Sequence, residues 1–266
     1  MNISSYFGLF KMQFKGELQY RGKAISGIFT QFFWGIMYIY LYTSFMKGGI
    51  EGFSISQMAT YIWLGQAFFA LRRIDSQPKV NMEIANGDVC YRFVRPLNVY
   101  NQWYTELAGQ KVASTLLRCF PIIIISILLP ANMRLSMPVN IWAFLLFLVA
   151  LVIGMFLAIA VTMFAYNITF ATMCSKGASG LVNVIVGLFN GGIIPIPLMP
   201  SSMQTLVKWL PFGCISDLPF RIYCGNINLK EGAIRICLGV IWFVVLVLIG
   251  KLILKKQLKN VVVQGG

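Results

Sequence analysis

The residues best suited to recognising a partner lie in one charged segment, residues 72–104. Ser76 can cap a helix with its hydroxyl, and Pro78 fits the first turn of that helix. Gly87 can end the helix after Asn86, because glycine readily adopts the left-handed conformation that follows many helices. The pattern therefore predicts a short helix that begins near Pro78 and ends at Asn86.

The faces of this helix indicate what it could recognise. Val80 and Ile84 share one face, while Lys79 and Glu83 are expected on the exposed side. The segment also contains three acids, namely Asp75, Glu83 and Asp88. A loop that only anchored to anionic lipid headgroups would avoid carboxylates. We therefore favour a helix that docks on a protein over a lipid-anchoring loop.

Arg118 is a second candidate for recognition. It follows Lys111 by two helical turns, which places it about 10 Å deeper in the membrane. It can face a cavity and meet an anionic substrate group, or its long stem can reach back to the inner interface. We favour the second interpretation.

Two amides, Asn183 and Asn190, recur at helical spacing in an apolar run with Gly180 and Gly187. Small residues allow close helix approach, and amides form hydrogen bonds across the contact. The same face can line a translocation path if it lies between two subunits. Packing and pathway both remain open interpretations of this pattern.

Catalytic chemistry has little support in the sequence. The chain has no histidine, which excludes histidine-dependent metal sites, triads and proton relays. None of its 8 acids lies deep in an apolar run, and it has no phosphate-binding loop. Cys214 and Cys224 can form a disulfide in an outer loop, although we favour unpaired thiols. We expect no enzyme activity, metal or cofactor in this chain.

Composition places these residues in a membrane protein. Hydrophobic residues make up 58% of the 266 residues and charged residues 11%, whereas soluble domains have about 25% charged residues. Six apolar runs approach the roughly 20 residues that cross a bilayer. They predict an all-α membrane protein with six transmembrane helices at residues 24–46, 56–71, 108–129, 141–166, 178–194 and 233–254.

The other segments complete one predicted transmembrane domain, residues 1–266. The lead segment places Phe7, Phe10 and Phe14 on one face, which predicts an amphipathic interfacial helix. Prolines interrupt the outer segment before the last span and predict broken, re-entrant helices. The predicted divisions are the interfacial helix at 1–23, spans one and two at 24–71, the charged insert at 72–107, spans three to six at 108–254 with the re-entrant segment at 192–231, and a basic tail at 255–266.

Positive charge determines the predicted orientation. Most lysines and arginines flank one side of the spans, in the lead, the insert and the tail. Both termini and the insert are therefore expected in the cytoplasm of a multi-pass protein of the cell membrane. The formal net charge of +14 lies in loops beside spans, which favours contact with membrane lipids. We expect no nucleic-acid binding.

The order of these elements resembles a known family, the type-2 ABC exporter permeases, and more narrowly its bacterial branch of multidrug or uncharacterised ABC permeases. The resemblance covers nearly the whole chain. Its local matches are Ile-Ala-Asn-Gly-Asp at 84–88, Val-Arg-Pro-Leu at 94–97, Gly-Ile-Ile-Pro at 192–195 and Leu-Pro-Phe at 210–212.

The resemblance implies that the helix in the insert is a coupling helix, seated in a separate ATP-binding subunit. Two such subunits would carry ATP and Mg, and a second permease, identical or homologous, would complete the transporter. The residues implied at the ATPase contact are Pro78, Lys79, Val80, Glu83, Ile84, Asn86, Gly87, Asp88, Arg92 and Arg95. The candidate pathway or subunit-interface residues are Phe68, Phe69, Arg118, Asn183, Phe189 and Asn190. The expected outer gate comprises Pro195, Pro197 and Pro200.

The expected function is the export of a hydrophobic or amphipathic compound, such as a drug, a peptide or a lipid-linked molecule. Aromatic, acid-poor spans suit such a substrate better than a metal ion. Two alternatives belong to other classes: a membrane enzyme that acts on lipids, and a non-transporting membrane scaffold or immunity protein.

Overall fold

The computed structural model describes residues 3–46, 53–94 and 96–259, and every regular element in these ranges is a helix. The all-α prediction is therefore confirmed. Arg95, expected at the ATPase contact, lies outside the described residues. The longer helices are α1 (Ile3–Gln19), α2 (Arg21–Met46), α3 (Ile55–Ala67), α6 (Val99–Ile127), α7 (Ile141–Thr172), α8 (Ser175–Phe189) and α11 (Leu229–Leu258). The shorter ones are α4 (Phe69–Arg72), α5 (Pro78–Ala85), η1 (Asp88–Arg92), η2 (Ile196–Leu198), α9 (Ser201–Trp209), η3 (Pro211–Cys214) and α10 (Asp217–Tyr223).

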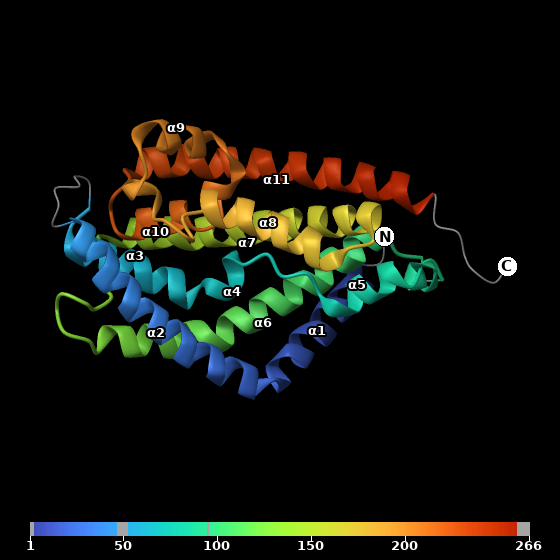
Figure 1. Ribbon diagram of the computed structural model, residues 1–266, viewed down its shortest axis with the longest axis horizontal. Helices are drawn as coiled ribbons and strands as arrows, with labels where there is room; N and C mark the ends of the chain where they lie inside the picture. The colour runs from blue at the N-terminus through green and yellow to red at the C-terminus, as the bar shows by residue number, and fades with distance from the viewer. Residues whose placement is uncertain (1–2, 47–52, 95, 260–266) are drawn as a thin grey trace.

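The long helices form an elongated bundle around α7 (Figure 1). This helix packs against α11, α8, α10 and α6. Its middle is closed to the surroundings, because Leu157, Ala158 and Ile159 have no exposed surface. A helix that is apolar on all sides is expected at the centre of such a bundle.

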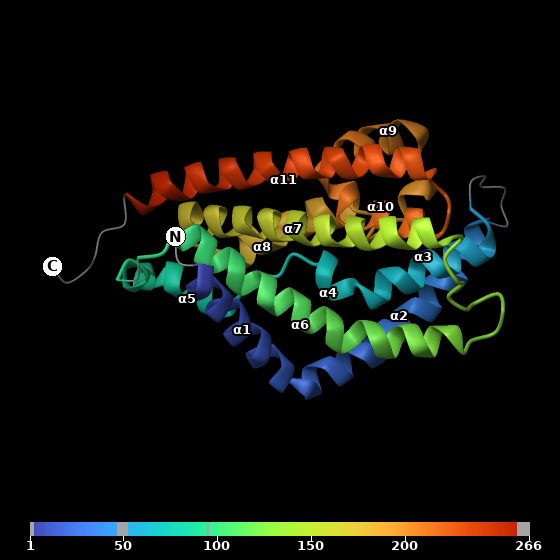
Figure 2. The same cartoon turned by 180° about the vertical axis from the view of Figure 1, so that it is seen from behind.

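The lead helix α1 does not lie apart from the bundle. It meets α2 at a sharp bend and runs along the first half of α6 (Figures 1 and 2). Gly109 of α6 permits this approach, because a Cβ atom there would lie 2.6 Å from the backbone oxygen of Phe10. Leu9 is buried, whereas Phe7 is 65% exposed. The position of α1 in the headgroup layer stays a prediction.

In the described part of the chain, four helices are long and apolar enough to cross a membrane, namely α2, α6, α7 and α11. The other two predicted spans are shorter. One is divided into α3 and α4 at Phe68, and the other is α8. The chain is therefore a multi-pass helical protein, and the count of six spans stays a prediction.

Several helix ends differ from the predicted boundaries. The fifth run ends as a helix at Phe189 and not at residue 194, because Gly191 has φ +75° and the chain turns there. The fourth continues to Thr172, beyond the predicted end at residue 166. Asn167 does not interrupt it, since the Asn167 side chain donates to the Gly250 carbonyl oxygen of α11 at 3.2 Å.

The third predicted run begins earlier than expected, at Val99. Asn98 caps α6 by accepting a hydrogen bond from the backbone N–H of Asn101 at 3.2 Å. Asn and the other N-capping residues satisfy the free N–H groups of a first turn. The last part of the predicted insert, up to residue 107, therefore belongs to α6, and the division between insert and span stays a prediction.

The segment between α8 and α11 consists of short helices joined at prolines. Cys214 and Cys224 are both free, buried thiols, which confirms the unpaired alternative. Asp217, which lies in the predicted re-entrant segment, is fully buried. It accepts a hydrogen bond from the Tyr61 hydroxyl at 3.0 Å and faces Arg221 at 3.7 Å. The carboxylate thus lies inside this end of the bundle and holds α10 against α3.

Candidate functional site

The predicted docking helix is present as α5, at the end of the bundle where α1 begins and α11 ends (Figure 1). Pro78 occupies its first turn, Asn86 is its C-cap, and Gly87 follows with φ +75°. The predicted cap is wrong, because Gln77 occupies the N-cap position. The Ser76 hydroxyl is instead within hydrogen-bond distance of Asn81 and of Ser179 in α8.

One face of α5 packs on the bundle. Val80 and Ile84 are buried, as their spacing predicts, and lie in a cluster with Trp103 and Tyr166. The Tyr166 hydroxyl also accepts a hydrogen bond from the backbone N–H of Gln77 at 2.9 Å. These contacts join the start of α5 to the central helix α7.

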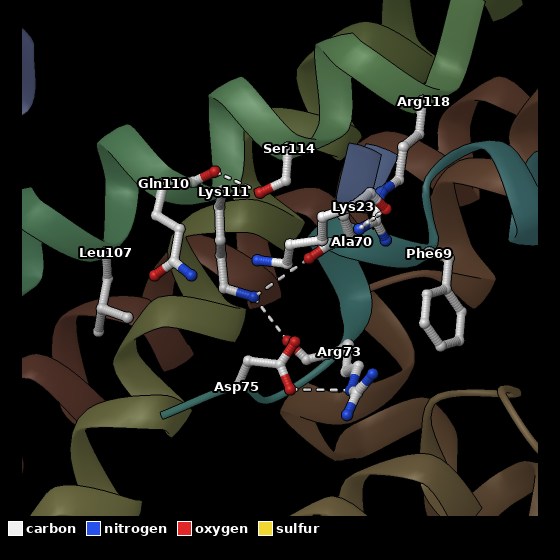
Figure 3. A pocket seen from close by; sticks show the side chains of 10 residues that line it. All are labelled: Lys23, Phe69, Ala70, Arg73, Asp75, Leu107, Gln110, Lys111, Ser114 and Arg118. Atoms are coloured by element: carbon white, nitrogen blue, oxygen red, sulfur yellow. Dashed lines mark hydrogen bonds and ion pairs between the residues drawn. The ribbon is translucent and has the colours of Figure 1, made fainter. Parts of the chain in front are cut away.

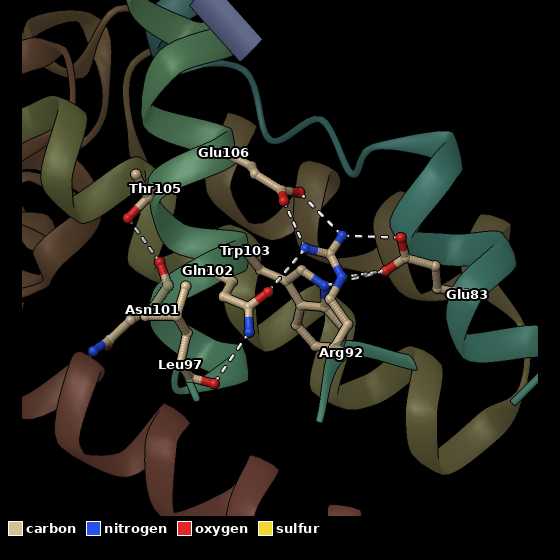
Figure 4. A network of polar contacts seen from close by, with 8 residues as sticks. All are labelled: Glu83, Arg92, Leu97, Asn101, Gln102, Trp103, Thr105 and Glu106. Atoms are coloured by element: carbon tan, nitrogen blue, oxygen red, sulfur yellow. Dashed lines mark hydrogen bonds and ion pairs between the residues drawn. The ribbon is translucent and has the colours of Figure 1, made fainter. Parts of the chain in front are cut away.

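An ion-pair network holds the other side of α5 (Figure 4). The guanidinium of Arg92 donates to both carboxylate oxygens of Glu83, each at 2.9 Å. It also donates to both carboxylate oxygens of Glu106 in α6, at 2.6 and 3.1 Å. Glu83 was expected to be exposed, but its side chain is only 15% exposed. Arg92 therefore joins α5, η1 and α6, and Glu83 acts within the chain.

The electrostatics of this network favour a charged arginine. Burial by itself lowers the pKa of Arg92, but its hydrogen bonds to Glu106 and Glu83 outweigh that effect. The pKa of Arg92 is consequently held above its usual range. One guanidinium shared by two carboxylates also leaves a net negative charge at the base of α5.

Beyond this network the end of the bundle presents an apolar surface. Met82 is 63% exposed and Tyr91 is 73% exposed. Phe93 and Val94, which follow Tyr91 closely in the chain, are exposed as well. Lys79, as predicted, is also exposed on α5. We call Met82, Tyr91, Phe93 and Val94 the α5 apolar surface. Exposed apolar side chains grouped in this way are typical of a protein contact.

A basic pocket lies between α2, α4 and α6 (Figure 3). Lys111 is buried there, and its ammonium donates to the carbonyl oxygens of Leu71 and Arg73 at 3.2 and 2.6 Å. It therefore caps the end of α4. Arg118 reaches the Lys23 carbonyl oxygen at 3.4 Å, which places its head at the start of α2. This position agrees with a side chain that reaches back along its own helix.

A groove of about 410 Å³ runs between α4, α8 and the turn after α8. Three of the six candidate pathway residues line it: Phe69, Asn183 and Asn190. Arg72 and Gly192 line it as well. The structure thus brings together residues that are more than one hundred positions apart in the sequence.

The other candidate residues lie elsewhere. Phe68 points into the core, where its ring contacts Phe147 and Phe220. Phe189 stacks on Phe212 outside the groove. Two of the expected gate prolines precede helices, since Pro195 is the N-cap of η2 and Pro200 the N-cap of α9, while Pro197 lies within η2.

The groove is joined directly to the start of α5. Asn183 accepts a hydrogen bond from the backbone N–H of Ile74, and the hydroxyls of Ser179 and Ser76 lie 2.6 Å apart. Both contacts tie the linker between α4 and α5 to α8. The polar face of α8 therefore packs on this chain's own linker at one end and lines the groove at the other.

Sequence reasoning missed Arg72 and Glu106 as functional candidates. Arg72 is the first residue of the predicted insert, and it lines the groove. Glu106 lies in the predicted insert, is almost fully buried, and accepts two hydrogen bonds from Arg92. Only the spacing of Glu106 from Gln102 on one helical face hinted at this role. Within the described ranges, no group of three histidine, cysteine or acidic residues is arranged to hold a metal ion.

The fold and the site together define a multi-pass helical membrane protein that presents a short, rigidly held helix at one end. The chain belongs to the ABC-2 family: the model of the ABC-2 family transporter protein matches residues 28–265. No curated protein matches the chain. It is accordingly a membrane permease component of an ABC transporter, and the family implies an ABC ATP-binding partner.

Proposed function

We propose that this chain is the permease subunit of an exporter that moves a hydrophobic or amphipathic compound out of a bacterial cell. Two copies of a separate ATP-binding subunit, which carry ATP and Mg, drive the movement. A second permease, identical or homologous, faces the groove. Both termini and α5 lie in the cytoplasm in this arrangement, as the distribution of positive charge favours.

The proposal is supported by two features of α5 that occur together, an exposed apolar surface and an opposite face that is fixed to the bundle. Its apolar surface is exposed, while its opposite face and Glu83 are held by the bundle. A helix held in this way moves as a rigid unit when a partner pushes on Met82 or Tyr91. The linker that follows α4 then carries the displacement to α8 through Asn183. The α5 apolar surface therefore fits the cleft of an ATPase subunit.

The test is a charge placed on the α5 apolar surface. Met82→Lys combined with Val94→Lys should abolish co-purification of the ATP-binding subunit from the native membrane, because two ammonium groups would have to be buried in the contact. Met137→Lys is the matched control, since Met137 is 76% exposed in the turn before α7. It should retain the partner.

Two results would contradict the proposal. If the unmodified chain purifies without any ATP-binding subunit, even after cross-linking in mild detergent, the coupled exporter is refuted. Retention of the subunit by the doubly substituted chain would refute α5 as its contact.

A further inference from the structure

The groove between α4 and α8 is lined by positively charged residues and by no negatively charged ones among the described residues. Its lining includes two arginines, Arg72 and Arg73, and two amides, but no carboxylate. Arg73 is neutralised outside the groove by Asp75, with Nε 2.8 Å from Oδ1. In the described residues, Arg72 has no ion pair, and its Nε atom is buried without a hydrogen-bond partner. Arg72 therefore carries the uncompensated charge of the groove.

The surroundings of Arg72 leave space for its head. The guanidinium lies over the Phe69 ring, with Cζ 5.2 Å from the ring centroid. On its other side is Gly192, where a Cβ atom would lie 2.6 Å from Nη1. Any side chain at position 192 would therefore displace Arg72. The absence of a side chain at Gly192 therefore leaves room for the guanidinium at the edge of the groove.

A cation at this position is costly without a partner. Arg72 ends α4, directly after the second predicted span, and the burial of its Nε atom disfavours a charge without a partner. Arginine in such a place usually faces a cavity or an anion. Its planar fork of donors suits two oxygens of one carboxylate or phosphate. The missing partner has the chemistry of an oxyanion.

The rest of the groove indicates what the oxyanion is attached to. Its remaining lining is largely apolar and includes Phe69, Val186 and Ile193. The volume of about 410 Å³ lies within the range of sites that bind small organic ligands. A charged head with an apolar body fits this combination better than a free inorganic ion.

We infer that the groove binds the anionic head of an amphipathic substrate, a carboxylate or a phosphate ester, through Arg72. This inference rests on the proposed function, because it takes the groove to be part of the substrate path. It narrows the substrate from any hydrophobic compound to an amphiphile with a negative head. Binding involves only ion pairing and apolar contact, with no covalent step.

The inference is tested by direct binding to the full chain in phosphatidylcholine nanodiscs. The probe is 11-(dansylamino)undecanoic acid, and its methyl ester is the neutral counterpart, with dansyl fluorescence as the signal. The acid should bind at least about tenfold more tightly than the ester, as expected for a charge-assisted bidentate pair. Equal affinities in the unmodified chain would overturn the inference without any variant.

Variants then assign the preference to Arg72. Arg72→Gln should reduce affinity for the acid to that of the ester, and Arg72→Lys should retain part of the preference because it keeps the charge. Lys176→Gln is the control, since it removes one exposed cation from α8 outside the groove. A preference that survives Arg72→Gln would overturn the inference.

Two further measurements are needed. One distinguishes an amphipathic ligand from a free small anion, and the other distinguishes failure of this inference from failure of the proposed exporter function. Displacement of the acid by inorganic phosphate at equal concentration would assign the site to small anions and refute an amphipathic substrate. If the chain co-purifies with an ATP-binding subunit but binds the acid and the ester equally, only the binding of an anionic head by Arg72 is refuted. If the chain prefers the acid but has no such subunit, the proposed exporter function is refuted instead.

Discussion

The carboxamide of Asn183 binds both backbone polar groups of Ile74. The Ile74 N–H donates to Asn183 Oδ1 at 3.2 Å, and Asn183 Nδ2 donates to the Ile74 carbonyl oxygen at 2.5 Å. Asn183 belongs to the groove helix α8, and Ile74 to the linker that leads into α5. One side chain therefore joins the proposed substrate groove to the proposed ATPase contact.

Asn183→Ala should uncouple these two parts. It leaves two backbone groups of Ile74 without partners, which costs about 1–3 kcal/mol of unfolding free energy where such groups are buried. Thermal unfolding in detergent should show this loss, and ATP hydrolysis should continue with less transport. Leu181→Ala, at an exposed position of the same helix, should change neither. Identical melting of the two variants would contradict the role of Asn183.

Removal of Arg92 should destabilise the end of the bundle that carries α5. Arg92→Met leaves the carboxylate of Glu106 buried without its partner, and breaking such a pair costs about 3–5 kcal/mol. Further substitution of both acids by glutamine should restore much of the loss, because no unpaired charge then remains. Lys79→Met, at an exposed position of α5, is the control. Urea or thermal unfolding measures the difference, and a single variant as stable as the control would refute the network.

The same network should be insensitive to pH in the physiological range. The pKa of Arg92 is raised by its hydrogen bonds to Glu106 and Glu83, although burial opposes the shift. A raised pKa stabilises the fold at every pH below the ordinary value for arginine, and that stabilisation is lost only above it. Unfolding measured between neutral and mildly alkaline pH should show an equal difference between Arg92→Met and the unmodified chain. A difference that shrinks across this range would contradict a permanently charged Arg92.

Gly109→Ala should loosen α1 from α6. The added Cβ would lie 2.6 Å from the Phe10 backbone oxygen, and a backbone atom cannot turn away as a side chain can. Overpacking of this kind costs about 1–3 kcal/mol. Gly22→Ala in α2 is a matched control, because a Cβ there meets nothing within 4 Å. Protease sensitivity of α1 provides the measurement, and equal sensitivity of the two variants would refute close packing.

Cys174 reports the orientation of the chain. It is an exposed thiol in the turn between α7 and α8, whereas Cys214 and Cys224 are buried. A membrane-impermeant maleimide should label it in inside-out vesicles and not in right-side-out vesicles, if both termini are cytoplasmic. Cys174→Ser provides the background. Labelling from the outer side would reverse the proposed orientation.

The groove shows why part of the site escaped sequence reasoning. Asn183 and Asn190 stood out because polar residues are rare in an apolar run, and their spacing placed them on one face. Arg72 did not stand out, because an arginine at the end of an apolar run is also a normal topology signal. Its place beside Gly192 depends on the turn after α8, which brings residues 190–194 back to α4.

Helix ends show the same division between local and distant causes. The bounds of α5 could be predicted, since Pro78 and Gly87 restrict the backbone by their own covalent structure. The end of α7 could not, because Asn167 stays helical only where the backbone of α11 accepts its side chain. The ion pair between Glu83 and Arg92 could not be predicted either, because no local sequence pattern links Glu83 to Arg92 and Glu106.

The sequence by itself determined the class of the protein. Apolar runs, scarce acids, the absence of histidine and the capped insert are local properties, and local hydrophobicity and backbone preference specify a helical membrane protein with a short helix in its charged insert. The tertiary structure alone decided which of the charges in the described residues are paired with each other and which are not. Ion pairing depends on distances of a few ångströms between residues far apart in the chain, and only the packing of α4, α6 and α8 sets those distances.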